Sequence, residues 1–295
     1  MHEPSQGRRG GLSSWFAGLS RPRRMLAVAA AIAILVAAGT VAIGAASGAP
    51  PQAYQHQALA HARRAGRPGP ASPVGPAQDR PGPVLLVPGY GGDTGSLAAL
   101  ASRIRAAGRR AIVLSLPGTG TGSLVADAAL LNAAVVRAMR GGAPSVDVIG
   151  YSAGGVVALL WARHDDGAAR ARRIVTLGAP FHGTQLAAVA QALVPGQCPA
   201  ACRQLVPGSP LLTSLDVARG AGLPPWLSIW TADDKVVTPP GSARLAGAID
   251  IELQAVCPTL AVTHSQLPTD PAVINMVLGA VSRAPMATPN HAVCH

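Results

Sequence analysis

The sequence predicts an α/β fold built on a mostly parallel, doubly wound sheet with helices on both faces. Three observations lead to this prediction. Short apolar runs alternate with segments whose apolar residues recur at helical spacing. Glycines and prolines separate the two kinds of segment. One junction carries the motif GYSAG at residues 150–154, where a predicted strand turns at once into a predicted helix.

The first two elements show how the pattern is interpreted. Residues 84–87 form a continuous apolar run, which is typical of a strand buried on both faces. Leu97, Leu100 and Ile104 follow at helical spacing, and Gly108 ends that helix. The same reasoning predicts further strands at residues 111–116, 145–149, 173–177, 226–230 and 249–256, and helices at residues 96–107, 124–140, 153–164 and 271–282. Prolines, two cysteines and short apolar pieces interrupt the alternation between residues 179 and 225, where we expect irregular structure.

The charge pattern of the N-terminal residues predicts that the rest of the chain is exported from the cytoplasm. Residues 1–24 carry five arginines, whereas residues 25–47 carry no charge. A helix over residues 25–46 of this run would be about 33 Å long, enough for a bilayer core of roughly 30 Å. It is either an uncleaved transmembrane anchor or the apolar region of a signal peptide, with residues 1–24 in the cytoplasm. Residues 48–82, rich in proline and glycine, are a predicted linker. We therefore expect residues 83–295 to form a domain on the outer face of the cytoplasmic membrane or in the extracellular space.

The net charge of +11 does not indicate a nucleic-acid-binding protein. Nine of the 24 basic side chains precede residue 84, so the predicted domain is only weakly basic. It contains no basic helix face interleaved with aromatic residues and no phosphate-binding loop of the form GxxxxGK[ST]. Binding to nucleic acid is therefore not expected.

Ser152 is the candidate nucleophile. A strand that turns directly into a helix brings residues 150 and 154 close together, so glycine is needed at both. The turn holds Ser152 in a strained conformation, with Oγ projecting at the end of the strand beside a helix N-terminus. A serine hydroxyl is a poor nucleophile at neutral pH and needs a base, which a third group must orient.

His264 is the candidate base and one of two aspartates is the candidate acid. In doubly wound hydrolases the order along the chain is serine, acid, histidine. His264 lies between the last predicted strand and the closing helix, where it can reach back over the sheet edge. Asp233 and Asp234 both follow the predicted strand 226–230, at the edge where open α/β sheets hold their sites. The residues alone leave the choice between these two open.

The oxyanion hole is expected at two backbone N–H groups. One belongs to Ala153, the residue after the nucleophile, and the other to Tyr90 in the glycine-rich loop after the first predicted strand.

The chain resembles the α/β-hydrolase lipases, in particular the secreted actinobacterial class 2 lipases and small bacterial triacylglycerol lipases. The resemblance covers roughly residues 82–282 and rests on these blocks: VPGYGG at 87–92, VIGYSAGG at 148–155, TLGAPFHGT at 176–184, DKVV at 234–237, HSQL at 264–267 and PAV at 271–273. It implies an α/β-hydrolase fold with a nucleophile elbow and little or no lid domain. The family's D-x-x-V pattern favours Asp234 over Asp233 as the acid, and it gives His182 no catalytic role.

We therefore expect a serine carboxylic-ester hydrolase, a lipase or esterase, that acts on lipid or other acyl esters through an acyl-enzyme. Apolar pieces between residues 186 and 215 are candidates for the wall along the acyl chain. The mechanism needs no cofactor and no metal ion. We expect a monomer that binds an acyl-ester or lipid substrate and, if its N-terminal segment is not cleaved, is attached to the membrane through that segment. The alternatives are an acyltransferase with the same triad and a non-catalytic, membrane-tethered binding protein on a hydrolase fold.

All four cysteines follow the uncharged segment, as disulfides in an oxidising compartment would require. Three pairings are possible. Cys198–Cys202 would close a tight loop, and Cys257–Cys294 would tie the His264 loop to the C-terminal tail.

Overall fold

The computed structural model describes residues 79–215, 217, 222–282 and 285–294. The predicted basic segment, residues 1–24, and the predicted anchor or signal segment, residues 25–47, lie outside this part, as does the predicted linker up to residue 78. Among the described residues, no helix is long and apolar enough to cross a membrane.

A single six-stranded sheet forms the centre of the described part, and every neighbouring pair of strands is parallel. The strands are β1 (Val84–Val87), β2 (Ala111–Val113), β3 (Val146–Tyr151), β4 (Ala171–Leu177), β5 (Trp226–Trp230) and β6 (Ile249–Glu252). Their order in the sheet is β2-β1-β3-β4-β5-β6. The chain therefore moves from β1 to one side and then returns to place β3 on the other side. Ligands of open α/β sheets bind at this kind of switch point, beyond the carboxyl ends of the strands.

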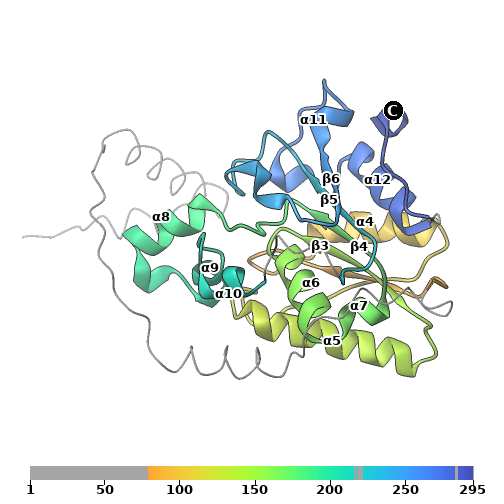
Figure 1. The fold of residues 1–295 in the computed structure, drawn as a ribbon, viewed down its shortest axis with the longest axis horizontal. Coiled ribbons are helices and arrows are strands. Elements are labelled where there is room, and N and C mark those ends of the chain that lie inside the picture. Colours follow the sequence, from red (N-terminus) through yellow and green to blue (C-terminus); the bar gives the residue numbers. More distant parts are fainter. Residues whose placement is uncertain (1–78, 216, 218–221, 283–284, 295) are drawn as a thin grey trace, which may run out of the picture. The chain divides into compact units, whose positions relative to one another are not determined.

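Helices cover both faces of the sheet. In Figure 1, α5 (Leu124–Arg140) and α6 (Ala153–His164) lie on one face, while α4 (Gly95–Ala106) and α12 (Pro271–Ser282) lie on the other. The remaining helices are short: α7 (Gly167–Arg170), α8 (Gln185–Leu193), α9 (Ala200–Gln204), α10 (Pro210–Ser214) and α11 (Leu253–Val256). The predicted α/β fold with a parallel, doubly wound sheet is confirmed.

Alternating strand residues build a core on each side of the sheet. Leu85 and Val87 of β1 belong to the cluster under α5 and α6, whereas Val84 and Leu86 belong to the cluster under α4 and α12. All four side chains are fully buried, which explains why the strand is apolar throughout.

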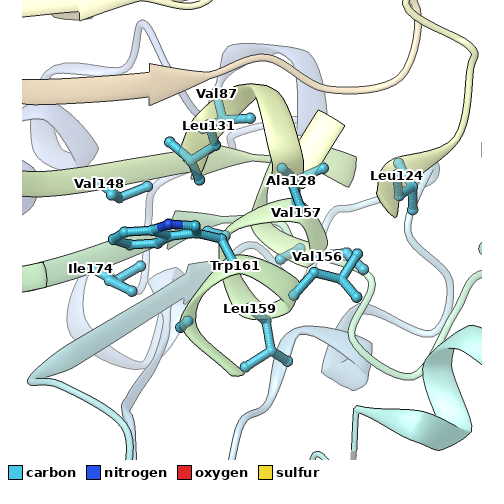
Figure 2. Packing of buried hydrophobic residues seen from close by; sticks show 14 of the residues in the cluster. Val87, Leu124, Ala128, Leu131, Val148, Val156, Val157, Leu159, Trp161 and Ile174 are labelled. Atoms are coloured by element: carbon cyan, nitrogen blue, oxygen red, sulfur yellow. The ribbon is translucent and has the colours of Figure 1, made fainter. Parts of the chain in front are cut away.

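Trp161 of α6 is one of the two tryptophans of the first cluster. Figure 2 shows its indole against Val148 of β3 and Ile174 of β4, with Leu131 of α5 alongside. Its ring nitrogen lies 3.3 Å from Asn132 Oδ1 and donates to it, so its polar atom is satisfied. The packing fixes α6, and thereby the junction at its N-terminus, against the two central strands.

Two predicted elements differ from the structure. The strand predicted at residues 249–256 ends at Glu252, because the fully buried Leu253 begins the short helix α11, which Cys257 closes by donating from its N–H to the Leu253 carbonyl. The strand predicted at residues 111–116 is only three residues long, since β2 is an edge strand with a neighbour on one side alone. The interval predicted to be irregular holds α8, α9 and α10, which lie together at one side in Figure 1.

Candidate active site

Ser152 stands at the junction of β3 and α6 with φ 52° and ψ −125°, a region that residues with side chains rarely adopt. Gly150 makes this turn possible, and Gly154 lets the start of α6 lie against the end of β1. A Cβ on Gly150 would lie 2.5 Å from the Gly154 carbonyl oxygen, and a Cβ on Gly154 would lie 2.3 Å from the Val87 carbonyl oxygen. The GYSAG motif therefore forms the sharp strand-to-helix turn that the sequence predicts.

Asp234 and His264 form a buried pair. Asp234 Oδ2 lies 2.6 Å from His264 Nδ1, and both side chains are almost completely shielded from solvent. The other carboxylate oxygen, Oδ1, accepts the N–H groups of Val236 and Val237, each at 2.8 Å. The carboxylate is thus held by its own loop while it orients the imidazole. A neutral imidazole that donates from Nδ1 has its acceptor lone pair on Nε2, which is the form a general base requires.

The structure distinguishes between the two adjacent aspartates. Asp233 is exposed, and its carboxylate accepts a hydrogen bond of 3.3 Å from Gln254 Nε2. Of these two aspartates, Asp234 is the one hydrogen-bonded to His264. His264 is therefore paired with the aspartate that the D-x-x-V pattern favours.

Ser152 and His264 each lie against the end of β4. The Ser152 N–H donates to the Leu177 carbonyl at 2.8 Å, and a Cβ on the next residue, Gly178, would lie 3.0 Å from His264 Nδ1. The ring of Tyr151, immediately before the serine, lies 5.2 Å from the His264 ring, centroid to centroid. Within the described residues, Ser152 Oγ forms no hydrogen bond with His264. Catalytic hydrogen bonds of this kind are often long in ligand-free enzymes and tighten with substrate.

The two predicted oxyanion donors belong to segments that contact Ser152 or adjoin it. A Cβ on Gly89 would lie 2.9 Å from Ser152 Cβ, which places the loop after β1 directly against the nucleophile. In this loop Gly92 donates to the Gly89 carbonyl at 3.0 Å, and no hydrogen bond within the described residues uses the Tyr90 N–H. Ala153 is the first residue of α6, so its N–H has no acceptor inside the helix.

Tyr151 adds a neutral donor beside the histidine. Its Oη donates to the His264 carbonyl oxygen at 3.3 Å. Burial, followed by the negative charges of Asp234 and Asp93, raises the pKa of Tyr151 to about 12. The phenol therefore keeps its proton at any pH at which the protein is expected to work. Sequence reasoning did not assign a role to this residue, although it lies inside the motif.

Thr184 is a second residue that sequence reasoning missed. Its hydroxyl donates to the Val236 carbonyl at 2.6 Å and accepts the Thr238 N–H at 3.2 Å. The conformation of the Asp234 loop is therefore supported by the segment that leads into α8. The only signal in the sequence was the TLGAPFHGT block, which the family resemblance placed at the border of the site.

His182 lies outside the pair formed by Asp234 and His264. Its Nδ1 lies 3.1 Å from the Ser242 carbonyl oxygen, at the edge of an open, mostly apolar cavity of about 360 Å³. The family resemblance gave this residue no catalytic role. In the described part of the chain, no group of three or more His, Cys, Asp or Glu side chains is placed to hold a metal ion.

Both disulfides named from the sequence are present, Cys198–Cys202 between the segment just before α9 and α9 itself, and Cys257–Cys294 between the end of α11 and the C-terminal tail. Among the described residues there is no free cysteine. The second disulfide joins the C-terminal tail to Cys257, where the segment that leads to His264 begins.

Comparisons with known proteins agree with this architecture. Residues 82–197 match the family model described as alpha/beta hydrolase fold. Lipase B of Aspergillus fumigatus is 19% identical, with 73% of this chain and 56% of that chain covered and a TM-score of 0.58. Bacillus licheniformis lipase BlEst2 in its propeptide form is 18% identical, with 75% and 54% covered and a TM-score of 0.52. A gene product of Listeria innocua is 15% identical, with 72% and 97% covered and a TM-score of 0.51.

This chain spans little more than half the length of the two lipases. No curated protein matches its sequence significantly. At identities below a fifth, the likeness to solved structures concerns the fold. The parallel sheet, the strained junction at Ser152 and the family match together show that the chain has the α/β-hydrolase fold.

Proposed function

We propose that the protein is a serine carboxylic-ester hydrolase. The observation that carries the proposal is the buried Asp234–His264 pair, at 2.6 Å, beside the strained turn that holds Ser152. Ordered carboxylate–imidazole pairs next to a hydroxyl nucleophile are the arrangement that activates serine for attack on acyl groups.

In the proposed reaction, Ser152 Oγ attacks the ester carbonyl carbon while His264 Nε2 takes the hydroxyl proton. The carbonyl oxygen becomes an oxyanion that accepts hydrogen bonds from the N–H groups of Tyr90 and Ala153. The bond to the alcohol oxygen then breaks, and the imidazolium returns its proton to the leaving alcohol. Water then attacks the carbonyl carbon of the acyl-serine while His264 takes a proton from the water. The bond to Ser152 Oγ breaks, Oγ takes the proton back from the imidazolium, and the carboxylic acid is released. Asp234 stabilises the imidazolium in both halves.

The surface beside the Asp234 loop supports an apolar acyl group as part of the substrate. Leu186, Val189 and Leu193 of α8 are 43%, 37% and 63% exposed, and Val236 of the Asp234 loop is 41% exposed. Groups of exposed apolar side chains on a monomeric protein often mark a binding site. We therefore propose that α8 forms part of the wall along the acyl chain of a lipid or other acyl ester.

We further propose that the domain acts outside the cytoplasm as a monomer, either secreted or tethered to the outer face of the membrane by the uncharged segment at residues 25–47. Two disulfides and no free cysteine among the described residues support an oxidising compartment.

A fluorophosphonate probe tests the proposed nucleophile. The folded wild-type protein should become covalently labelled, and Ser152→Ala should not. Hydrolysis of p-nitrophenyl esters from acetate to palmitate then defines the acyl preference, and a competing alcohol separates hydrolysis from acyl transfer. A folded wild type that neither reacts with the probe nor cleaves any of these esters would refute the proposed function.

A further inference from the structure

The loop after β2 contacts the loop that carries the proposed oxyanion donor. The Gly91 N–H donates to the Gly120 carbonyl at 3.0 Å. The Gly120 N–H in turn donates to the Pro117 carbonyl at 3.1 Å, so Gly120 closes a tight turn of its own. Gly120 is buried, although residues 117–119 before it are exposed. The two loops are far apart in the sequence, and the pairing of β1 with β2 brings them together.

There is no room for a side chain between these two loops. A Cβ on Gly120 would lie 2.4 Å from Gly92 N, 2.5 Å from Gly92 Cα and 2.8 Å from Gly91 C. All three are backbone atoms, which cannot swing aside as the end of a flexible side chain can. Any residue larger than glycine at this position must therefore displace the backbone of residues 91–92.

The turn at residues 89–92 also contacts the nucleophile, through its first residue, Gly89. Residues 89–92 are closed by the hydrogen bond from Gly92 to Gly89, and the Cα of Gly89 faces Ser152 so closely that a Cβ would lie 2.9 Å from Ser152 Cβ. Tyr90 lies within this turn. The turn is thus in contact with Gly120 through Gly92 and with Ser152 through Gly89. A displacement at the Gly92 end changes where the Tyr90 N–H points relative to Ser152.

We infer that Gly120 is a positioning residue for the oxyanion hole. Its small size and its carbonyl set the place of the turn at residues 89–92 and hence of the Tyr90 N–H. This inference rests on the proposed function, because it assigns the Tyr90 N–H to a developing oxyanion. Gly120 itself does not touch the substrate.

The same loop supplies a matched control. Gly118 has φ +58° and Gly120 has φ +63°, so alanine is strained by a similar amount at both positions. Gly118, however, has no atom within 4 Å of its would-be Cβ. The variants Gly120→Ala and Gly118→Ala therefore share the backbone strain and differ in the contact with Gly92.

Kinetics of the two variants test the inference. Because loss of one oxyanion donor lowers kcat by about 100-fold to 1,000-fold, Gly120→Ala should lose on the order of 100-fold in kcat with little change in KM. Gly118→Ala should keep kcat within about threefold, as expected when no interaction specific to the transition state is lost. Thionoester substrates provide the specific readout, since sulfur is a weak hydrogen-bond acceptor. Gly120→Ala should lose much more activity on the oxygen ester than on the matching thionoester.

Gly92 offers a second pair of variants in case Gly120→Ala does not fold. A Cβ on Gly92 would lie 3.2 Å from Gly120 Cα, a milder overlap, whereas a Cβ on Gly91 meets nothing within 4 Å. Both positions have positive φ. Gly92→Ala should lower kcat on oxygen esters, and Gly91→Ala should do so much less.

An NMR measurement makes the test independent of turnover. The amide resonance of Tyr90 should shift in Gly120→Ala and stay in place in Gly118→Ala. If the wild type is active and Gly120→Ala and Gly118→Ala lose kcat equally, the positioning role of Gly120 is wrong and the proposed function still stands. An unmoved Tyr90 resonance in Gly120→Ala would have the same meaning. An inactive wild type would instead count against the proposed ester hydrolysis, and the Tyr90 resonance would still decide whether Gly120 positions the turn.

Discussion

At the scale of single residues, the neighbouring carboxylates Asp233 and Asp234 show how environment separates chemically identical groups. Every oxygen of Asp234 has a fixed partner, two backbone N–H groups on one and the imidazole on the other. Asp233 faces solvent and shares a hydrogen bond with Gln254. The same side chain is therefore a rigid orienting group at one position and a surface group at the next.

Asp234→Asn should lower kcat by about 10,000-fold, because an amide that turns its NH₂ toward Nδ1 favours the wrong imidazole tautomer. Asp233→Asn should change kcat by less than about twofold, as expected of a solvated surface substitution. The measurement is steady-state hydrolysis of a short p-nitrophenyl ester by both variants. Similar losses in the two variants would contradict the assignment of the acid.

Tyr151 predicts a particular behaviour at alkaline pH. Its pKa is raised to about 12 in the folded protein, whereas an unfolded tyrosine ionises near 10. The protonated phenol is favoured by folding, so this contribution to stability is complete below pH 10 and is lost as the pH rises from 10 toward 12. Ultraviolet titration of tyrosinate should show a late step that Tyr151→Phe removes. A Tyr151 that ionises together with an exposed tyrosine would disprove the shift.

At the scale of secondary-structure elements, a buried ionic cluster fastens the end of α12 to the beginning of β3. The carboxylate of Asp147 is fully buried and pairs with Arg109 at 2.7 Å and with Arg172 at 2.5 Å. Both arginines also donate to the Val281 carbonyl at the C-terminus of α12, where positive charge complements the helix dipole. Burial and the neighbouring Arg172 lower the pKa of Arg173, which follows Arg172 on β4.

Asp147→Asn should lower the free energy of unfolding by about 3–5 kcal/mol, because it leaves buried guanidinium groups without a counter-charge. Urea denaturation measures this loss, with Asp233→Asn as an exposed carboxylate for comparison. The kcat of the folded variant should stay close to that of the wild type, since Asp147 lies near the start of β3 and Ser152 follows its end. A stable Asp147→Asn variant would show that the cluster contributes little.

At the scale of the whole molecule, sequence reasoning succeeded where local pattern and chain order carry the information. Strand β1 is apolar and buried throughout, and Gly150 of the motif at Ser152 is needed for contacts only four and five residues along the chain. These features are visible in a short window of sequence. His264 was placed by its position after the last strand, and the structure brings it beside Asp234 and Tyr151.

Sequence reasoning failed where tertiary contacts decide the structure. The run at residues 249–256 has no period that separates a strand from a strand followed by one helical turn, and burial of Leu253 settles the difference. The choice of Asp234 needed a family pattern, because two adjacent aspartates follow the strand. The contact of Gly120 with Gly92 joins loops that only strand pairing brings together.

The position of β1 between β2 and β3 in the sheet also has a consequence for folding, because the site is built from segments that are far apart in the chain. The oxyanion loop follows β1, the nucleophile follows β3, the acid follows β5, and the base precedes α12. Parallel pairings join segments that are distant along the chain, and such non-local contacts form slowly. No early fragment of the domain holds a complete site. We therefore expect helical content to recover first on refolding and ester turnover to return only when the whole sheet has assembled.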